Sequence, residues 1–264
     1  MQMTFDEYIA NPLGKRNAVL SAITRESIRK DYTYRFNNIL LRENGKIDYH
    51  LYKAKDNSYI IYIKIPSETV KKFYYDVVIR FYLNDNKLLS STSLNKYQFQ
   101  VFSNDPAFIY THAYVFNENG LIFQDLKSKI GKIPLHQVPK VTNPGRTLAY
   151  VKSIYFAYLF MSNRGLFKTV TWSAAEKYNK ASLLNEVMKA EDKIALRQEE
   201  GSKLTKKNQL ILDKQSAKQV KRPDSGISDN TRQAIVVGTK NSSTVRKTRI
   251  TKPTKNTKTI AKKF

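Results

Sequence analysis

Four runs of aromatic and β-branched residues between Lys46 and Asn104 constrain the fold more than any other feature of this sequence. Runs of this kind, bounded by polar turn residues, are typical of β-strands. They read KIDYHLYKA, SYIIYIKIP, YYDVVIRFYL and KYQFQVFSN. Only Lys55, Asp56 and Asn57 separate the first run from the second, which indicates a hairpin. The sequence therefore predicts a sheet of at least four strands.

The third run indicates how this sheet is arranged. Its residues alternate between two faces, with Val77, Ile79, Phe81 and Leu83 on one and Asp76, Val78, Arg80 and Tyr82 on the other. Alternation suits an antiparallel sheet with one face on a core and one near water better than a doubly wound parallel sheet. We expect Tyr62, Tyr74 and Tyr82 to lie partly exposed, as on surfaces that a partner covers. The alternative is that these tyrosines edge an ordinary core with their hydroxyls in water.

Capping patterns predict two helices before the sheet. Thr4 and Glu7 stand at capping-box spacing, so a short helix is expected to begin there and to stop at Asn11-Pro12. Residues 17–40 read as a second helix. Its apolar side is expected to contain Val19, Leu20, Ile23, Ser27 and Ile28.

Two further helices and a connection are predicted after the sheet. Asp105 as N-cap, Pro106 at the first helical position and Gly120 just past the end mark one helix. Residues 132–146 hold three prolines and are expected to form an extended connection. The segment TLAYVKSIYFAYLFM that follows is expected to be helical. Because it is apolar on nearly all sides, we expect it to be buried or packed on another subunit.

The C-terminal part begins with a predicted polar helix. Ser173 and Glu176 again show capping-box spacing, which predicts a helix from Ala174 to about Glu200, with Gly201 after it. Its apolar positions do not sustain a heptad, so we interpret it as a stalk rather than an independent coiled coil. The chain is therefore predicted to be α+β: an antiparallel β-sheet with packed helices, then a long helix and an extended basic C-terminal arm. The corresponding regions are residues 1–172, 173–201 and 202–264.

Positive charge is concentrated in the basic arm. The net charge is +24, and the 16 Lys/Arg and 3 Asp/Glu between Thr205 and Phe264 account for +13 of it. The arm is too polar to bury a core, so we expect it to be disordered when free. Its charge suits nucleic acid, an acidic membrane or an acidic protein; a solvated tail that aids solubility is the alternative. The candidate nucleic-acid or partner-binding residues are Lys221, Arg222, Arg246, Lys247, Arg249, Lys252, Lys255, Lys258, Lys262 and Lys263.

Catalytic and cofactor motifs are not found in the sequence. Without cysteine there are no disulfides, zinc-thiolate sites or cysteine nucleophiles, and the three histidines, His50, His112 and His136, lack metal-ligand spacing. No glycine-rich phosphate loop occurs. A metal-dependent nuclease would need Asp48 and a second acid two residues before Lys64 to share a divalent ion, but that position holds Tyr62. Asp76 is interpreted as forming a surface ion pair with Arg80. We therefore expect no enzyme activity, no cofactor and no metal.

Three segments of the body carry a family resemblance. KFYYDVVIRFYLND, FSNDPAFIYTHAYVFNENGL and VKSIYFAYLFM resemble virion structural proteins of tailed bacteriophages with AT-rich genomes. The resemblance covers roughly Thr4 to Met161 and leaves the basic arm outside. It implies a component of the head-to-tail region or tail that is present in several copies.

The resulting hypothesis is a virion structural protein that assembles in the host cytoplasm. Its expected partners are portal, ring or tail subunits and other copies of itself, with the basic arm on neighbouring subunits or packaged DNA. The N-terminus lacks the basic segment followed by an apolar segment that is typical of a secretory signal, and no apolar run is long enough to span a membrane. The first alternative is a non-specific nucleic-acid-binding protein of phage DNA metabolism. A third is a host-interaction protein with a basic localisation or membrane segment.

Overall fold

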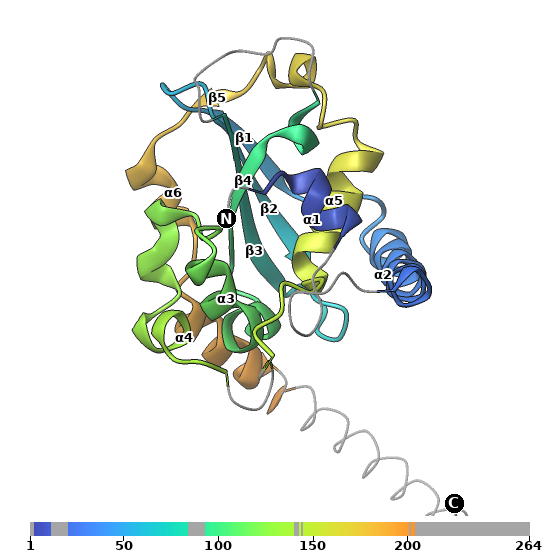
Figure 1. Ribbon diagram of the computed structural model, residues 1–264. Helices are drawn as coiled ribbons and strands as arrows, with labels where there is room; N and C mark the ends of the chain where they lie inside the picture. Colours follow the sequence, from blue (N-terminus) through green and yellow to red (C-terminus); the bar gives the residue numbers. More distant parts are fainter. Residues whose placement is uncertain are drawn as a thin grey trace, which may run out of the picture. The chain divides into compact units, whose positions relative to one another are not determined.

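The body of the protein is a mixed five-stranded sheet with helices on both faces (Figure 1). This computed structural model describes residues 3–11, 21–83, 93–139, 143, 145–200 and 202–203. The strands are β1 (Tyr49–Lys53), β2 (Tyr59–Pro66), β3 (Tyr74–Tyr82), β4 (Gln98–Ser103) and β5 (Glu176–Lys177). The α-helices are α1 (Phe5–Ala10), α2 (Ala22–Arg42), α3 (Ala113–Glu118), α4 (Lys132–His136), α5 (Lys152–Asn163) and α6 (Lys180–Glu186). Shorter helical turns are η2 (Leu94–Lys96), η3 (Phe108–His112), η4 (Gln124–Lys129) and η5 (Thr169–Trp172).

The four predicted runs form the four long strands, which confirms the sheet and the α+β class. The order is β4-β3-β2-β1-β5, and β1 to β4 pair antiparallel in sequence order. The predicted hairpin joins β1 and β2, with Asn57 in the turn at φ 60°. The two-residue β5 pairs parallel to β1, so the complete sheet is mixed rather than purely antiparallel.

Both faces of the central strands are buried, so the expectation of one face near water is wrong. Val78 and Asp76 on the second face of β3 are as inaccessible as Ile79 on the first. Tyr62 is only 1% exposed, whereas Tyr74 and Tyr82 are partly exposed as expected. The reason is that a helical segment far along the chain covers the second face (Figure 1).

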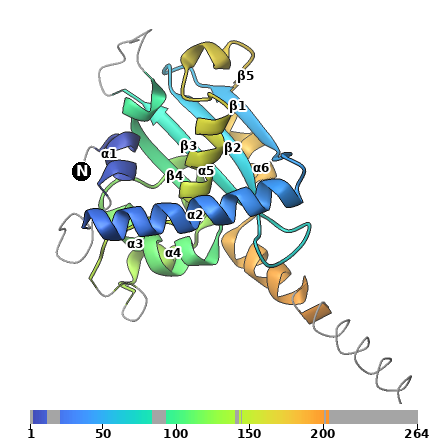
Figure 2. The same ribbon diagram turned by 90° about the vertical axis from the view of Figure 1, so that its right-hand side faces the viewer.

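The first face of the sheet packs against α1, α5 and, outside them, α2 (Figure 2). The capping box of Thr4 and Glu7 is present, and α1 ends at the predicted place, with Asn11 as C-cap. Phe5 of α1 packs edge-on against Phe81 and Phe99, at ring-centroid distances of 5.5 and 5.0 Å. These aromatic contacts fix α1 over β3 and β4.

Of the two longer helices on this face, α2 buries different residues from those expected, whereas α5 follows its prediction. Helix α2 begins after Ser21 and buries Phe36 and Ile39, whereas Ile23 is 82% exposed. The predicted apolar side is therefore wrong for Ile23 and Ser27, which are exposed, but right for Ile28, which packs against the core. Val19 and Leu20 lie outside the described residues. Helix α5 is buried along most of its length, as its apolar density predicts.

The helix after the sheet follows its predicted signals. Asp105 Oδ1 accepts a hydrogen bond from the Ala107 amide, and Gly120 has φ +71°. Between these ends the chain passes through the π-helical turn η3 into α3. Residues 132–136 are helical as α4, which corrects the predicted extended connection at its start.

The C-terminal helical segment starts later than predicted. Ser173 follows the turn η5 and Glu176 lies in β5, so no capping box forms there. Helix α6 begins at Lys180 with Asn179 as N-cap, the backbone is extended at Val187, and helix resumes at residue 190. Its apolar side chains Leu183, Val187 and Ala190 are buried, so the segment packs on the body instead of forming a stalk.

The chain divides into two units, Met1–Lys207 and Asn208–Phe264. The first contains every element named above. The second and most of the basic arm lie outside the described residues, so the expected disorder of the arm stays a prediction. Within the described part of the chain, no helix combines the length and apolarity needed to cross a membrane.

Candidate functional site

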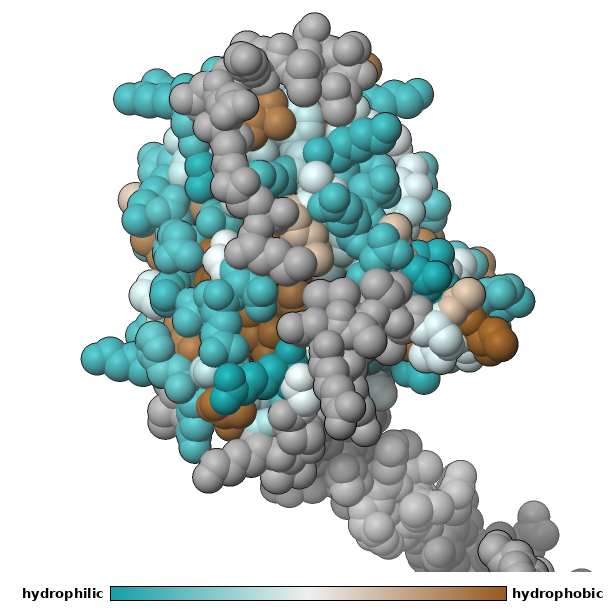
Figure 3. Space-filling view, viewed as in Figure 1, coloured by the Kyte–Doolittle hydropathy of each residue, from teal (hydrophilic) through white to brown (hydrophobic). Residues whose placement is uncertain are grey.

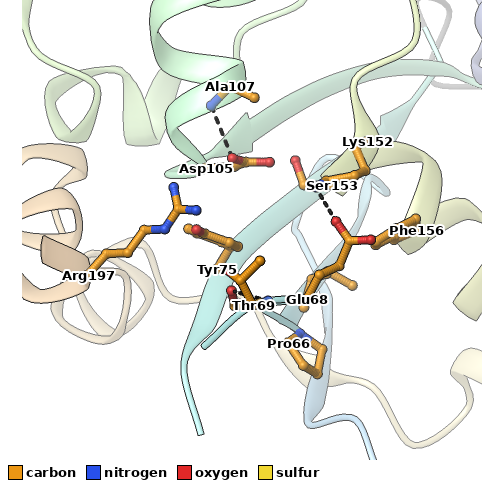
Figure 4. Close-up of a pocket in the computed structure, with 12 residues that line it drawn as sticks. Pro66, Glu68, Thr69, Tyr75, Asp105, Ala107, Lys152, Ser153, Phe156 and Arg197 are labelled. Carbon is orange, nitrogen blue, oxygen red and sulfur yellow. Dashed lines mark hydrogen bonds and ion pairs between the residues drawn. The ribbon is translucent and has the colours of Figure 1, made fainter. Parts of the chain in front are cut away.

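A cavity of about 190 Å³ lies where five segments meet at one end of the sheet (Figure 4). The end of β2 and the following turn supply Ser67, Glu68 and Thr69, and β3 supplies Tyr75. Asp105 comes from the start of the η3–α3 helix, Lys152 and Ser153 from the first turn of α5, and Arg197 from the C-terminal helical segment. The site thus joins residues up to about 130 positions apart.

Asp105 is the buried acid of this cavity, with 6% of its surface exposed. Burial raises the pKa of its carboxyl above the usual value. Hydrogen bonds from the Ala107 amide and the Ser153 hydroxyl and the charges of Lys152 and Arg197 oppose this only in part. The Asp105 amide donates to Ser103 Oγ at 3.2 Å, and Ser103 Oγ lies 3.2 Å from Ser153 Oγ. Asp105 therefore favours its neutral form more than an aspartate in water does.

An ion pair between Glu68 and Lys152 lines another side of the cavity. Arg35 of α2 also approaches Glu68, with 3.8 Å between Nη1 and Oε1. Arg42 holds the turn in place by donating to the carbonyls of Ser67 and Glu68, at 2.6 and 3.0 Å. The Glu68 carboxylate is thus neutralised by cations from two helices.

Arg197 lies on the opposite side of the cavity from the Glu68–Lys152 pair (Figure 4). Its guanidinium carbon is 5.9 Å from the centre of the Tyr75 ring. No carboxylate of the described residues lies within 4.0 Å of this guanidinium. Arg197 is therefore a half-buried cation without an ion-pair partner in the described part of the chain.

A second polar cluster is buried around Asp76, on the second face of the sheet. Its carboxylate accepts hydrogen bonds from Tyr62 Oη at 2.9 Å, Asn104 Nδ2 at 2.6 Å and the Met188 amide at 3.3 Å. Burial raises the pKa of Tyr62, and the charge of Asp76 raises it further. With all its partners inside the protein, this cluster is a structural network rather than an open site.

The expected surface ion pair of Asp76 with Arg80 is wrong. Arg80 pairs with Asp56 in the β1–β2 turn instead and donates to Ser58 Oγ at 3.1 Å. Asp76 and Arg80 lie on the same face of β3, but this face is covered near the start of the strand, where Asp76 lies, and partly open at Arg80. The packing of the C-terminal segment decides this difference, because it supplies the Met188 amide to Asp76.

The three histidines do not form a metal site. His50 is in β1, His112 ends η3 and His136 ends α4. Among the described residues no three His, Asp or Glu side chains are placed to hold a metal ion. His112 is partly buried, and its Nδ1 has no hydrogen-bond partner in the described structure. Burial lowers the pKa of His112 to about 4.

The solvent side of α2 carries exposed apolar side chains. Ile23, Tyr34 and Leu41 are 82, 68 and 77% exposed, and they lie opposite the buried Phe36 and Ile39. Figure 3 shows hydrophobic surface among polar atoms over this helix, at the right of the view. We call the surface formed by Ile23, Lys30, Tyr34, Asn37 and Leu41 the outer face of α2.

The basic residues predicted to bind a partner all lie beyond residue 203, outside the described residues. Sequence reasoning missed the cavity, because Glu68, Lys152 and Arg197 form no local motif; only Asp105 carried a signal, as a helix cap. Comparison with protein-family models, curated proteins and solved structures finds no match to this chain.

Proposed function

We propose that this protein is a structural subunit of a tailed-phage virion, joining a ring or lattice in the head-to-tail region or tail. The observation that carries the proposal is the division of the chain into residues 1–207, which contain the packed sheet and helices, and residues 208–264, whose 14 Lys/Arg and 3 Asp/Glu carry +11 of the net charge of +24. A body with its own core can occupy a fixed place in an assembly, while a basic polar segment can follow an acidic surface. The resemblance of the body to phage virion proteins adds to this.

The outer face of α2 is the proposed contact between copies. Ile23 and Leu41 lie nine residues to either side of position 32, and Lys30 and Tyr34 lie two residues to either side. Two antiparallel copies of α2 crossing at this position would place Ile23 on Leu41 and Lys30 on the Tyr34 ring. The spacing is thus self-complementary, which a two-fold contact requires. Lys30 over Tyr34 would add a cation–π contact.

Sedimentation of the full chain tests this contact. Wild-type protein is expected to form dimers or larger species that I23E/L41E abolishes, because two carboxylates would be buried without partners. Val170→Glu is the matched control, since Val170 is 74% exposed outside α2. A monomeric wild type, or equal dissociation in the control, would contradict the contact. Absence of the chain from purified particles of the phage that encodes it would contradict the virion role.

The basic arm is proposed to bind neighbouring subunits, and two sets of substitutions test this. Ile235, Val236, Val237 and Phe264 are not needed for phosphate contacts, whereas they suit apolar pockets on a protein. Replacing Ile235, Val236 and Val237 by Ser should therefore reduce incorporation into particles more than replacing Arg246, Lys247 and Arg249 by Ser. The opposite order would indicate DNA as the partner.

Non-specific binding of nucleic acid is the second candidate, favoured by the excess positive charge. Each neutralised phosphate releases counterions, so the log–log slope of affinity against salt should approach about 0.9 per contact. Sedimentation with duplex DNA at several salt concentrations measures this slope. A steep slope with monomeric protein would favour this candidate over the structural one.

A further inference from the structure

Cations and carboxylates both line the cavity at the end of β2, and of the two lining cations only Arg197 has no ion pair within 4.0 Å among the described residues. Glu68 is neutralised by Lys152 and approached by Arg35, and burial favours the neutral form of Asp105. The positive charge of Arg197 acts on the Asp105 carboxyl without forming an ion pair within 4.0 Å, and it only partly offsets the effect of burial on the Asp105 pKa. A cation held partly out of water gains by pairing with an anion.

The cavity carries several hydrogen-bond donors beside the Glu68 and Asp105 carboxylates. Lys152 Nζ, the Arg197 guanidinium and the hydroxyls of Ser153 and Thr69 line it. Helix α5 also begins here, and no side chain caps its first turn among the described residues. Uncapped amides at a helix N-terminus carry partial positive charge and favour negatively charged groups. Arginine and lysine together suit the oxygens of a phosphate group.

The size of the cavity restricts the ligand further. Its volume of about 190 Å³ is below the roughly 300–1,000 Å³ of pockets for drug-sized ligands. Arg197 and the Glu68–Lys152 pair lie on opposite sides of the cavity, so an anion inside it would lie between the two cationic side chains (Figure 4). We propose that this cavity binds a small phosphate-type oxyanion, either free or as the terminal group of a small phosphomonoester. This site is independent of the assembly role proposed above.

Thermal unfolding of the full chain with inorganic phosphate, at constant ionic strength against chloride, tests the proposal. A ligand that binds the folded state raises Tm, and the concentration dependence gives its Kd. Arg197→Gln should weaken the apparent Kd at least tenfold. The matched control is Lys189→Gln, which removes one positive charge from the same helical segment outside the cavity, at an exposed position. The basic arm is unchanged in both variants, so its own phosphate binding cancels in the comparison.

Glu68→Gln is a second variant with the opposite expectation. Without the Glu68 carboxylate, Lys152 is released from its ion pair and should bind the anion more strongly, so phosphate should raise Tm further than in wild type. A residue with a merely structural role would lower Tm without increasing the phosphate effect. This variant keeps the proposal testable even where Arg197→Gln fails to fold.

Glycerol 3-phosphate distinguishes the two sources of the anion. An equal stabilisation by glycerol 3-phosphate and inorganic phosphate, lost in Arg197→Gln, supports a phosphomonoester site. Stabilisation by inorganic phosphate alone, lost in the same variant, supports a site for the free anion. Equal stabilisation of wild type, Arg197→Gln and Lys189→Gln, or none in wild type, would overturn the proposal.

Discussion

The Tyr62 hydroxyl donates a hydrogen bond to Asp76 Oδ1 over 2.9 Å, inside the protein, between neighbouring strands of the sheet. Tyr62 is 1% and Asp76 3% exposed. The same carboxylate also accepts from the Met188 amide, where the chain is extended between its two last described helices. This pair therefore links the second face of the sheet to the C-terminal segment that covers it.

Removing the Asp76 carboxylate is expected to destabilise the body strongly. Asp76→Ala removes the acceptor of the Tyr62 hydroxyl, of one Asn104 Nδ2 hydrogen and of the Met188 amide, at about 1–3 kcal/mol for each buried donor. We expect a loss of about 3 kcal/mol or more in the free energy of unfolding, measured by urea titration. Tyr62→Phe removes only one donor and should cost about 1–2 kcal/mol. Tyr82→Phe, at a partly exposed position, is the control, and an effect of Asp76→Ala no larger than this control would contradict the expectation.

Asp105→Asn should stabilise the protein at neutral pH. Because the pKa of Asp105 is raised in the folded state, folding binds a proton that the unfolded state releases above about pH 4. The ionised Asp105 carboxyl therefore lowers the free energy of unfolding as pH rises through the folded-state pKa. Asparagine has no such charge and can still accept from the Ala107 amide. Urea titrations should show equal stability near pH 3.5 and higher stability of the variant at pH 7; a less stable variant at pH 7 would show that charge pairing outweighs burial.

His112 should make stability depend on pH in the acidic range. Its pKa falls from 6.5 to about 4 on folding, so the unfolded state binds the proton first as pH decreases. The stabilisation is fully present above about pH 6.5 and is lost as pH approaches 4, with an upper bound of about 3 kcal/mol. Urea titration from pH 7 to 4.5 should show a smaller loss for His112→Asn than for wild type. Parallel curves would contradict the prediction, since carboxylate titration is common to both proteins.

Two truncations separate the basic arm from the segment that packs on the sheet. A chain ending at Lys207 keeps the first compact unit, so its Tm should lie within a few degrees of the full-length value. A chain ending at Asn179 loses the buried Leu183, Val187 and Ala190, together about 5 kcal/mol of apolar burial. That is comparable with the whole stability of an ordinary domain. Circular dichroism should show no cooperative transition for the shorter chain; a normal transition would show that residues 180–207 are dispensable.

The sequence determined the elements whose signals are local. The four strands, the hairpin turn and the caps at Thr4 and Asp105 each depend on residues within a few positions of one another. Side-chain alternation and capping act through the neighbouring backbone, so they are visible in the linear chain. The same reasoning failed at Ser173 and Glu176, where capping-box spacing occurs without a helix because β5 pairs with β1 instead.

Tertiary structure alone decided which surfaces are buried and where charged groups meet. The alternation in β3 does not show that residues beyond 180 return to cover its second face, so Tyr62 and Asp76 could not be assigned to the interior from their strands. The cavity likewise depends on Glu68, Asp105, Lys152 and Arg197, which approach one another only after the sheet, α5 and the C-terminal segment have packed. Burial and electrostatic interactions depend on distance in space, and the sequence positions of these four residues do not predict that distance.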